Sequence, residues 1–469
     1  MDKPGKQRQP LPQLLAKVRK NRVFRAGSIA GAIKALGLLS AFALQLLLAR
    51  IVINPEQYGI YAWSQNLLFL LGTLMTLGIP VAVSRFVAVH TSRGDGASVA
   101  AVARSGARWL VLSTLLVSGT VALVIIAMPA EVFEKLPRET TLIAVASAPL
   151  ATFSLFYQAL ARARSRLVTA FLPLQVLRPL SFAALAFTVL VALGEPLAAP
   201  EIMLALCMSL ALVVFVQIVY ATSAKPRRAV TRSAAEATAD NTFSPERLLG
   251  NALPIFGVRL SDLAMKHGGV LALGVLVDPR AAAAYFVAER LAQLASVPQT
   301  VIASVVQPWL ASASAEGDQD ALQRTVSQAG HATLWPSLVA VIGLLLTGPM
   351  LLGLFGPGYL EAFPILAVLL TNHLLAATLG PAQQVLIMSG LQSAVLKTTS
   401  LAGVIHLVSL FLLIPWLGAL GAALTGIIST MVISTGCLFH VRSRLGLNPT
   451  ILSKSVTSEK RSQKHDESE

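Results

Sequence analysis

The stretch GNALPIFGVRLSDLAMKHGGVLALGVL, residues 250–276, is long and apolar enough to cross a lipid bilayer, yet it carries Arg259, Asp262, Lys266 and His267. At 100° per residue, the first three of these side chains lie within about 60° of one another on one face of a helix. A charge at the centre of a bilayer costs about 2.5–3.5 kcal/mol on the insertion scale. We therefore expect these groups to face a partner or a water-filled cavity rather than lipid.

The charges on this face have two interpretations. In the first, Asp262 neutralises Arg259 three residues before it and Lys266 four residues after it, and the cluster only holds the structure together. In the second, the surplus positive charge faces a central cavity and meets an anionic substrate. Features elsewhere in the chain bear on the choice.

The composition is typical of a helical membrane protein. Of the 469 residues, 55% are hydrophobic and only 13% are charged, and the mean hydropathy is +0.70. Soluble chains have about 25% charged residues. Apolar runs of about 20 residues recur between short polar breaks, which predicts an all-α polytopic membrane protein rather than a barrel. Cys207 and Cys437 lie in opposite halves and no metal-ligand spacing is found, so we expect no metal and no cofactor.

We predict about twelve transmembrane helices in two groups of six. The first six are expected at 29–49, 61–84, 109–128, 141–161, 167–193 and 201–221. The last six are expected at 250–276, 282–310, 332–352, 362–388, 398–414 and 419–440.

The positive charges predict how these spans are oriented. With the N-terminus inside, 28 of the 37 lysines and arginines fall in cytoplasmic segments, 4 fall outside and 5 lie within spans. This asymmetry follows the positive-inside rule and predicts that both termini are cytoplasmic. The net charge of +15 is thus explained by topology, and we expect no nucleic acid as a partner. The basic N-terminus lacks a small-residue cleavage site, so the first span is expected to stay uncleaved.

The longest polar break, residues 222–247, divides the chain into six spans plus six. It is rich in Ala, Ser, Thr and charge, which predicts a flexible cytoplasmic linker. Two equal halves in parallel orientation predict a transporter built of two lobes around a central cavity. The predicted organisation is a basic cytoplasmic tail, an N-terminal six-helix lobe, a cytoplasmic linker, a C-terminal six-helix lobe and a cytoplasmic tail, at residues 1–28, 29–221, 222–249, 250–440 and 441–469.

Motifs near the span ends resemble those of a known transporter family. The turn Asn54-Pro55-Glu56-x-Tyr58-Gly59-x-Tyr61 resembles the "GP-x-x-[YF]-G" turn of polysaccharide-export flippases, with Asn54 where that family usually has Gly. Those flippases belong to the multidrug/oligosaccharidyl-lipid/polysaccharide exporter superfamily. Further segments fit the same family in order and spacing: Leu77-Gly78-Ile79-Pro80 with Arg85; Tyr285, Ala288, Glu289 and Arg290; Val297-Pro298; Gln307-Pro308-Trp309-Leu310; Phe355-Gly356-Pro357-Gly358-Tyr359; and Ile414-Pro415-Trp416-Leu417-Gly418-Ala419-Leu420-Gly421-Ala422-Ala423.

The resemblance implies a multi-pass transporter of the bacterial inner membrane rather than an enzyme. It implies that two lobes rock about a central cavity and flip a polyprenyl-diphosphate-linked oligosaccharide from the cytoplasmic to the periplasmic leaflet. The product would serve exopolysaccharide, capsule or O-antigen (lipopolysaccharide) synthesis. The implied partners are this lipid-linked oligosaccharide, membrane lipids and other polysaccharide-assembly membrane proteins.

The charged residues within the spans are the candidates for function. The candidates for substrate binding are Lys34, Arg178, Arg259, Lys266 and Arg290. Only Asp262 and Glu289 oppose them, so three positive charges are in surplus. Cations can replace the hydration of a diphosphate with charge-assisted hydrogen bonds, which favours an anionic substrate over the cationic drugs of related exporters. Asp262, Glu289 and His267 are candidates for ion coupling or charge balance, although such a histidine is more often a packing residue.

Several of these residues also have a purely structural interpretation. Lys34 is only about one and a half turns inside its span, so its ammonium can extend to the headgroups. Arg178 precedes Pro179, which frees carbonyls that the guanidinium could satisfy locally. Glu289 and Arg290 point about 100° apart, so we do not expect them to pair with each other.

Covalent chemistry is not indicated anywhere in the chain. It has no Walker motif, no Gly-rich nucleotide loop and no plausible catalytic triad, so we predict no catalytic residues. A membrane-embedded polysaccharide polymerase or ligase is expected to carry a large external loop, whereas each external loop here has about a dozen residues or fewer. Two transporter alternatives stay open: a cation-coupled multidrug antiporter of the same superfamily, and a peptidoglycan lipid-precursor flippase, whose relatives usually have fourteen spans.

Overall fold

The computed structural model of the chain describes residues 22–92, 95–222, 245–303, 306, 319–378 and 382–447. Within these ranges every named element is an α-, 3-10 or π-helix, and the residues form no β-strand beyond a bridge between Val52 and Leu197. The predicted all-α fold is therefore confirmed. Most of the predicted tails and linker, and the motif at 307–310, lie outside the described residues.

The first half of the chain supplies helices that follow the predicted spans closely. They are α2 (Arg22–Ile51), α3 (Pro55–Leu74), α4 (Ile79–Ser92), α5 (Gly96–Ala127), the 3-10 turn η1 (Ala130–Phe133), α6 (Arg138–Ala163), α7 (Leu167–Leu172), the π-helix η2 (Pro173–Leu177), α8 (Arg178–Leu193) and α9 (Ala199–Thr222). The predicted second span thus consists of two helices, α3 and α4, with a bend between them.

The second half begins with α10, which starts a few residues before the span predicted from residue 250. Its elements are α10 (Pro245–Leu276), α11 (Pro279–Ala292), the 3-10 turn η4 (Gln293–Ser296), α13 (Gln319–Phe355), the 3-10 turn η5 (Pro357–Ala362), α14 (Phe363–Thr378), α15 (Ala382–Met388) and α16 (Gln392–Leu445).

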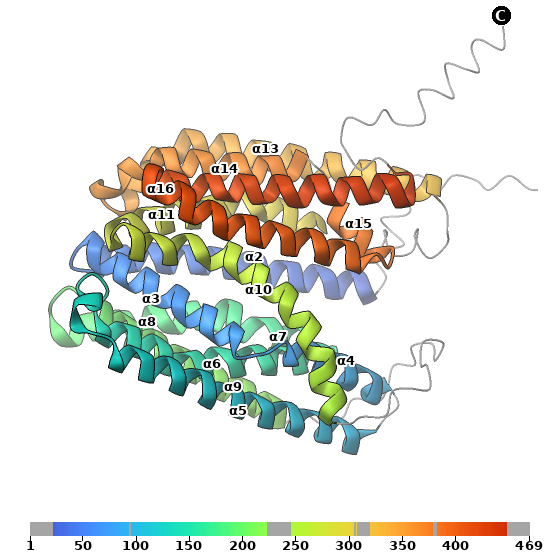
Figure 1. Cartoon of the computed structure of the whole chain (residues 1–469), viewed down its shortest axis with the longest axis horizontal. Coiled ribbons are helices and arrows are strands. Elements are labelled where there is room, and N and C mark those ends of the chain that lie inside the picture. The colour runs from blue at the N-terminus through green and yellow to red at the C-terminus, as the bar shows by residue number, and fades with distance from the viewer. Residues whose placement is uncertain are drawn as a thin grey trace, which may run out of the picture.

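The two halves of the chain lie on opposite sides of one elongated bundle (Figure 1). Helices α5, α6, α8 and α9 form one side, α13, α14 and α16 form the other, and α2, α3 and α10 run between them. Helix α3 packs against both α10 and α11, so the halves meet along it. We call α2–α9 the N-terminal lobe and α10–α16 the C-terminal lobe. The charge pattern predicts that the turns at 52–54, 277–278 and 356 are external. We therefore call the end of the bundle with these turns the outer end, and we call the opposite end the inner end.

The second helix of each lobe begins in the same way. The side chain of Asn54 accepts a hydrogen bond from the backbone N–H of Gln57 at 2.9 Å, and that of Asp278 accepts one from Ala281 at 2.6 Å. A proline follows each capping residue at the start of the helix, where its missing N–H has no intrahelical partner to lose. Asn54, where the resembling flippases usually have Gly, therefore supplies a side-chain cap, and the second helix of each half of the chain starts with the same pair of features.

The number of spans cannot be counted directly from the apolar helices. Among the described residues, eight helices are long and apolar enough to cross a membrane, or nine if the bent pair Pro55–Leu74 and Ile79–Thr91 forms one span. Helix α10, with its charged face, is not among them, and α16 counts once although it contains two predicted spans. The total of twelve stays a prediction.

Helix α16 folds back on itself at Gly418, whose φ of 55° and ψ of −131° are not helical. On either side of this residue the two arms run antiparallel. His406 contacts Ser429 through Nδ1 and Oγ at 2.8 Å, and a Cβ at Gly436 would overlap the side chain of Thr398. The hairpin brings the predicted spans at 398–414 and 419–440 side by side.

We expect Gly418→Ala to destabilise the protein, because a residue with a side chain disfavours a positive φ. Holding such a residue in this strained conformation costs about 1–3 kcal/mol. No neighbouring atom lies within 4 Å of the added Cβ, so the loss of stability would come from backbone strain and not from a steric clash. Gly119→Ala, in α5 and equally free of neighbours, is the matched control and should not lower stability. Thermal unfolding of the purified variants in detergent measures both, and equal midpoints for the two variants would contradict the expectation.

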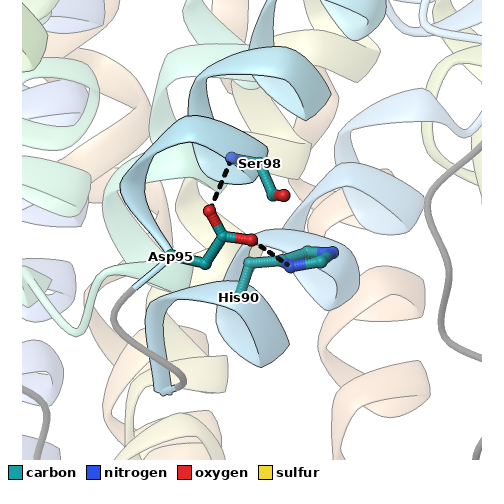
Figure 2. Close-up of polar contacts among 3 residues, drawn as sticks. All are labelled: His90, Asp95 and Ser98. Atoms are coloured by element: carbon teal, nitrogen blue, oxygen red, sulfur yellow. Dashed lines mark hydrogen bonds and ion pairs between the residues drawn. The ribbon is translucent and has the colours of Figure 1, made fainter.

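At the inner end, α4 and α5 meet in a corner held by an acidic cap (Figure 2). One oxygen of Asp95 accepts a hydrogen bond from the backbone N–H of Ser98 at 2.9 Å, and the other lies 3.5 Å from Nδ1 of the buried His90. Hydrogen bonds from Ser98 hold the pKa of Asp95 below its usual value. Because the folded state favours the ionised carboxylate, Asp95 stabilises the fold above its unfolded pKa and loses this contribution as the pH falls through its folded pKa.

We therefore expect Asp95→Asn to flatten the acid end of the stability profile, below about pH 4, since the amide oxygen can still accept from Ser98 but does not titrate. Asp95→Ala should instead lower stability at every pH, because the cap itself is lost. Unfolding temperatures between pH 7 and pH 3 distinguish the two variants. An unchanged acid limb in Asp95→Asn would show that this carboxylate does not contribute to it.

Candidate functional site

A cavity of about 370 Å³ lies between the two lobes, with walls from α2, α3, α6, η2, α8, α9, α10 and α11. Four of the five basic residues predicted within spans line it, and the fifth, Lys34, does not. The polar and charged lining residues are Gln45, Gln65, Asn66, Thr73, Gln175, Arg178, Arg259, Asp262, Lys266, His267 and Arg290. The predicted central cavity is therefore present, and it is strongly basic.

The charged face of α10 points into this cavity, as its spacing predicts. Nη1 of Arg259 lies 3.4 Å from Oδ2 of Asp262, and about half of each side chain is exposed. Lys266 makes no hydrogen bond or ion pair with any residue in the described part of the chain. Asp262, the acid on this face of α10, thus compensates Arg259, while Lys266 stays uncompensated.

Arg178 reaches the cavity from the junction of η2 and α8. Its guanidinium lies over the ring of Phe69, with Cζ 5.0 Å from the ring centroid. The sequence suggested that this guanidinium satisfies a carbonyl freed by Pro179. Instead, the Arg178 carbonyl itself accepts a hydrogen bond from the hydroxyl of Ser209 at 2.9 Å, and no described carbonyl binds the guanidinium. Its charge is left facing the cavity beside an aromatic ring, an arrangement that is favourable for a cation.

Arg290 is held by its own helix rather than by an acid. Its Nη1 donates to Oε1 of Gln293 at 3.0 Å, and its guanidinium lies 4.4 Å from the ring centroid of Phe286. Nε2 of Gln293 donates in turn to Oε1 of Glu289 at 3.3 Å. As their separation around the helix predicts, Glu289 and Arg290 do not form a direct ion pair but share Gln293. The second oxygen of Glu289, Oε2, is buried and has no partner among the described residues.

Within the described residues, no carboxylate oxygen lies within 4.0 Å, the limit for an ion pair, of the side-chain nitrogens of Arg178, Lys266 or Arg290. The three charges act on one another electrostatically across the cavity. Like charges repel strongly where water is limited. An anion with several oxygens would relieve this repulsion and could accept hydrogen bonds from all three donors.

Two other predicted candidates have different surroundings. Nζ of Lys34 lies 5.2 Å from the ring centroid of Phe171, on an exposed part of α2 outside the cavity. His267 lines the cavity, but its Nδ1 donates to Oδ1 of Asn66 at 2.7 Å, which joins α10 to α3. The Asn66 amide nitrogen donates to the carbonyl of Ala62 at 2.8 Å. His267 thus has the packing contact expected of a helix-interface histidine.

Sequence reasoning missed three amide residues of the cavity wall, Gln65, Asn66 and Gln175. The signal that could have found them is the presence of amide side chains within otherwise apolar spans. It is weak, because such residues often serve helix packing alone. Only their common placement on one cavity distinguishes them.

Above the cavity, the outer end is closed by buried aromatic side chains. The ring of Tyr58 lies 6.1 Å from that of Phe286 and 6.1 Å from that of Tyr359, between centroids. The Tyr58 hydroxyl donates to Oε1 of Gln45 at 3.0 Å. Tyr58 and Tyr61 have no exposed surface. This closure joins residues from both lobes.

The turn motifs that carry the family resemblance meet at the same closure. A Cβ at Gly59 would overlap the carbonyl oxygen of Pro279, so α3 and α11 approach as closely as a glycine permits. Nearby, a Cβ at Gly358 would lie 3.8 Å from Cγ of Pro55. At the other end of the cavity, Arg259 and Asp262 remain about half exposed. Within the described residues, aromatic side chains therefore close the cavity toward the outer end, whereas charged lining residues toward the inner end remain exposed.

A family profile described as "Polysaccharide biosynthesis protein" matches residues 30–314. Among proteins with curated functions, none matches the chain in sequence.

Several solved transporter structures share the fold. The inward-facing conformation of a multidrug resistance MATE family transporter of the MOP superfamily gives a TM-score of 0.70 at 16% identity, over 88% of this chain and 98% of that chain. The lipid II flippase MurJ in an inward closed conformation gives 0.62 at 14% identity, over 88% and 87%. A MOP superfamily transporter from Pyrococcus furiosus gives 0.60 at 16% identity, over 90% and 96%. At these identities the likeness establishes the fold.

Proposed function

Because this chain belongs to the polysaccharide biosynthesis protein family and is a membrane transporter of the MOP superfamily rather than an enzyme, we propose that it flips a polyprenyl-diphosphate-linked oligosaccharide. The movement is from the cytoplasmic to the periplasmic leaflet of a bacterial inner membrane, with both termini in the cytoplasm. The product supplies synthesis of exopolysaccharide, capsule or O-antigen.

The observation that carries this proposal is the set of three cations in the cavity without a carboxylate partner: Arg178, Lys266 and Arg290. The fold is shared with a multidrug transporter and with a lipid II flippase, so it does not choose a substrate class. Charge does. A cationic drug would meet repulsion from these three groups, and the one acid of the described lining, Asp262, is paired with Arg259. A diphosphate would replace its lost hydration with hydrogen bonds from the same three groups.

The geometry supports alternating access as the mechanism. The polyprenyl tail stays in the bilayer while the diphosphate and sugars enter the cavity from its open, inner side. Binding neutralises the mutual repulsion of the cations, which otherwise resists approach of the lobes. The outer closure must then separate, and the contact between Gly59 and Pro279 is where α3 parts from α11. A ligand shifts such an equilibrium only through its different affinity for the two states.

Of the three coupling candidates, Glu289 fits ion coupling best. Asp262 is held by Arg259 and His267 by Asn66, whereas Oε2 of Glu289 is buried without a partner in the described part of the chain. A proton bound at this oxygen would neutralise the carboxylate and weaken the hydrogen bond that Gln293 donates to Glu289, while Gln293 still accepts one from Arg290. Lys34 is assigned no role in the cavity by this proposal and lies where its ammonium can contact lipid headgroups.

The test is mass spectrometry of polyprenyl-linked glycans in cells depleted of this protein. The proposal predicts accumulation of a complete glycan repeat on its lipid, facing the cytoplasm, and the glycan is identified by the same spectrum. Accumulation of a peptidoglycan precursor instead would assign the chain to that lipid. No accumulation, with increased sensitivity to cationic drugs, would contradict the proposal and favour the multidrug alternative.

A further inference from the structure

The two lobes present different chemistry to the cavity. The wall from the C-terminal lobe carries the cations Arg259, Lys266 and Arg290, whereas the wall from the N-terminal lobe carries one cation, Arg178, and four amides: Gln45, Gln65, Asn66 and Gln175. Amides both donate and accept hydrogen bonds, so they complement sugar hydroxyls and acetamido groups, whereas ammonium and guanidinium groups only donate. This division separates a part of the cavity suited to phosphate from a part suited to uncharged polar groups.

Most of the amides are already committed to the protein. Gln45 donates to the Tyr61 hydroxyl at 3.3 Å and accepts from Tyr58, and Gln65 also donates to Tyr61. Asn66 uses its oxygen for His267 and its nitrogen for a backbone carbonyl. These residues join the cavity wall to the aromatic side chains of the outer closure. Their removal would therefore disturb the closure as well as the binding of a ligand.

Gln175 differs because its amide makes no hydrogen bond with any described residue. It lies half-buried on η2 and lines the cavity. Its Cβ approaches α2 at Gly37, where an added Cβ would lie 2.8 Å from the Cβ of Gln175 and 3.1 Å from its Oε1. The absence of a side chain at Gly37 makes room for Gln175. An amide placed against a cavity with both donor and acceptor unused is poised for a ligand.

The backbone that positions Gln175 is itself unusual. Residues Pro173–Leu177 form a π-helix, with the backbone N–H of Arg178 donating to the carbonyl of Pro173. Proline has no N–H, so Pro173 and Pro179 remove helical hydrogen bonds on both sides of this turn and make the widening inexpensive. Such π-turns occur in well under 1% of residues and are often found at functional sites. Here the widened turn directs both Gln175 and Arg178 into the cavity.

We propose that this π-turn recognises the glycan and that Gln175 is a specificity-determining residue. Its amide hydrogen-bonds a hydroxyl or acetamido group of a sugar. Arg178 and the cations of the C-terminal lobe hold the diphosphate. The proposal rests on the proposed function, since it requires a substrate that carries both a diphosphate and sugars. It assigns phosphate affinity and sugar recognition to different residues, so the two can be separated by mutation.

The experiment compares two probes on the purified full-length protein by native mass spectrometry: polyprenyl diphosphate alone, and polyprenyl diphosphate carrying the repeat glycan. We expect Gln175→Ala to weaken binding of the glycan-bearing lipid by about 2- to 10-fold, as for one neutral hydrogen bond. Its affinity for the bare polyprenyl diphosphate should not change. Gln175→Asn, which keeps an amide on a shorter side chain, should recover part of the loss.

Two further variants guard against indirect effects. Gly37→Ala keeps the amide but displaces it, and should lower affinity for the glycan-bearing lipid selectively. Leu174→Ala changes the same turn and cavity wall without a hydrogen-bonding group and should not discriminate between the probes. Equal affinities of wild type and Gln175→Ala for the glycan-bearing lipid, or an equal loss for both probes, would overturn this inference alone. Failure of both probes to bind the wild type would overturn the proposed function as well.

Discussion

Replacing Lys266 by glutamine is expected to slow flipping of a polyprenyl-diphosphate saccharide by about 10-fold or more while leaving the fold intact. A hydrogen bond to a charged group contributes about 1.5–3 kcal/mol, which corresponds to a factor of roughly 10 to 150 in binding. Because Lys266 has no hydrogen bond or ion pair within the described residues, its loss should not lower the unfolding temperature. The measurement is the initial rate at which a fluorescent lipid-linked saccharide changes leaflets in proteoliposomes.

Arg259→Gln is the matched control for this prediction. Arg259 lies on the same helix and the same cavity, but it is paired with Asp262 at 3.4 Å. Its neutralisation leaves the acid of the pair facing the cavity, and the net change in charge is the same as for Lys266→Gln. If charge number alone governed transport, the two variants would be equally slow. We expect the larger loss at Lys266, and a Lys266→Gln protein as active as the wild type would contradict the cationic-cavity mechanism.

The second large effect is expected at the outer closure. Gly59→Ala places a Cβ on the carbonyl oxygen of Pro279, and because this neighbour is backbone, α11 itself must move. Overpacking of this kind costs typically about 1–3 kcal/mol, so the closed outer end should become roughly 5- to 150-fold less populated relative to open forms. Flipping should be largely lost, because alternating access needs both ends to close in turn.

Cysteine labelling can detect this change of conformation directly. Ala41 lines the cavity below the closure, so Ala41→Cys should react slowly with a membrane-impermeant thiol reagent added from the outer side. In the Gly59→Ala background the same cysteine should react faster. Gly343→Ala, in α13 with no atom within 4 Å of the added Cβ, should leave both labelling and flipping unchanged. Unaltered labelling in the Gly59→Ala protein would show that this contact does not hold the outer end closed.

The charged face of α10 shows why part of the site was accessible from the sequence. Three charged residues within an apolar helix cannot face lipid, and helical spacing decides that Arg259, Asp262 and Lys266 share one face. The structure contains contacts that belong to each of the two initial interpretations, and the anionic substrate stays a proposal. Asp262 does pair with Arg259, and Lys266 is left to face the cavity. Composition and periodicity were sufficient for the helical fold in the same way.

Other features depend on contacts between distant segments, which no local pattern encodes. Nothing in the spacing of Arg290 indicates that Gln293 joins it to Glu289, since the rotamers of three neighbouring side chains decide that. Lys34 resembled Lys266 in the sequence, yet its ammonium lies beside Phe171 of α7, outside the cavity. The π-turn at Gln175 was also missed, since two prolines six residues apart are compatible with a simple kink. These are differences of tertiary packing rather than of propensity.

The turn motifs illustrate an intermediate case. Asn54-Pro55 and Asp278-Pro279 could each be recognised as the start of a helix, and the resemblance placed the Asn54 turn in a transporter family. That Gly59 then touches Pro279 across the two lobes follows only from the assembled bundle. The glycine is explained by this contact, not by the turn itself.

The central claim is that the cavity selects an anionic diphosphate through Arg178, Lys266 and Arg290. The most direct measurement is the affinity of the purified protein for polyprenyl diphosphate and for a hydrophobic dication of similar size, in wild type and in the variant with all three residues changed to glutamine. We predict that the wild type binds the diphosphate and not the dication, and that the variant loses the diphosphate. A wild type that prefers the dication, or a variant that binds the diphosphate as tightly as before, would contradict the claim.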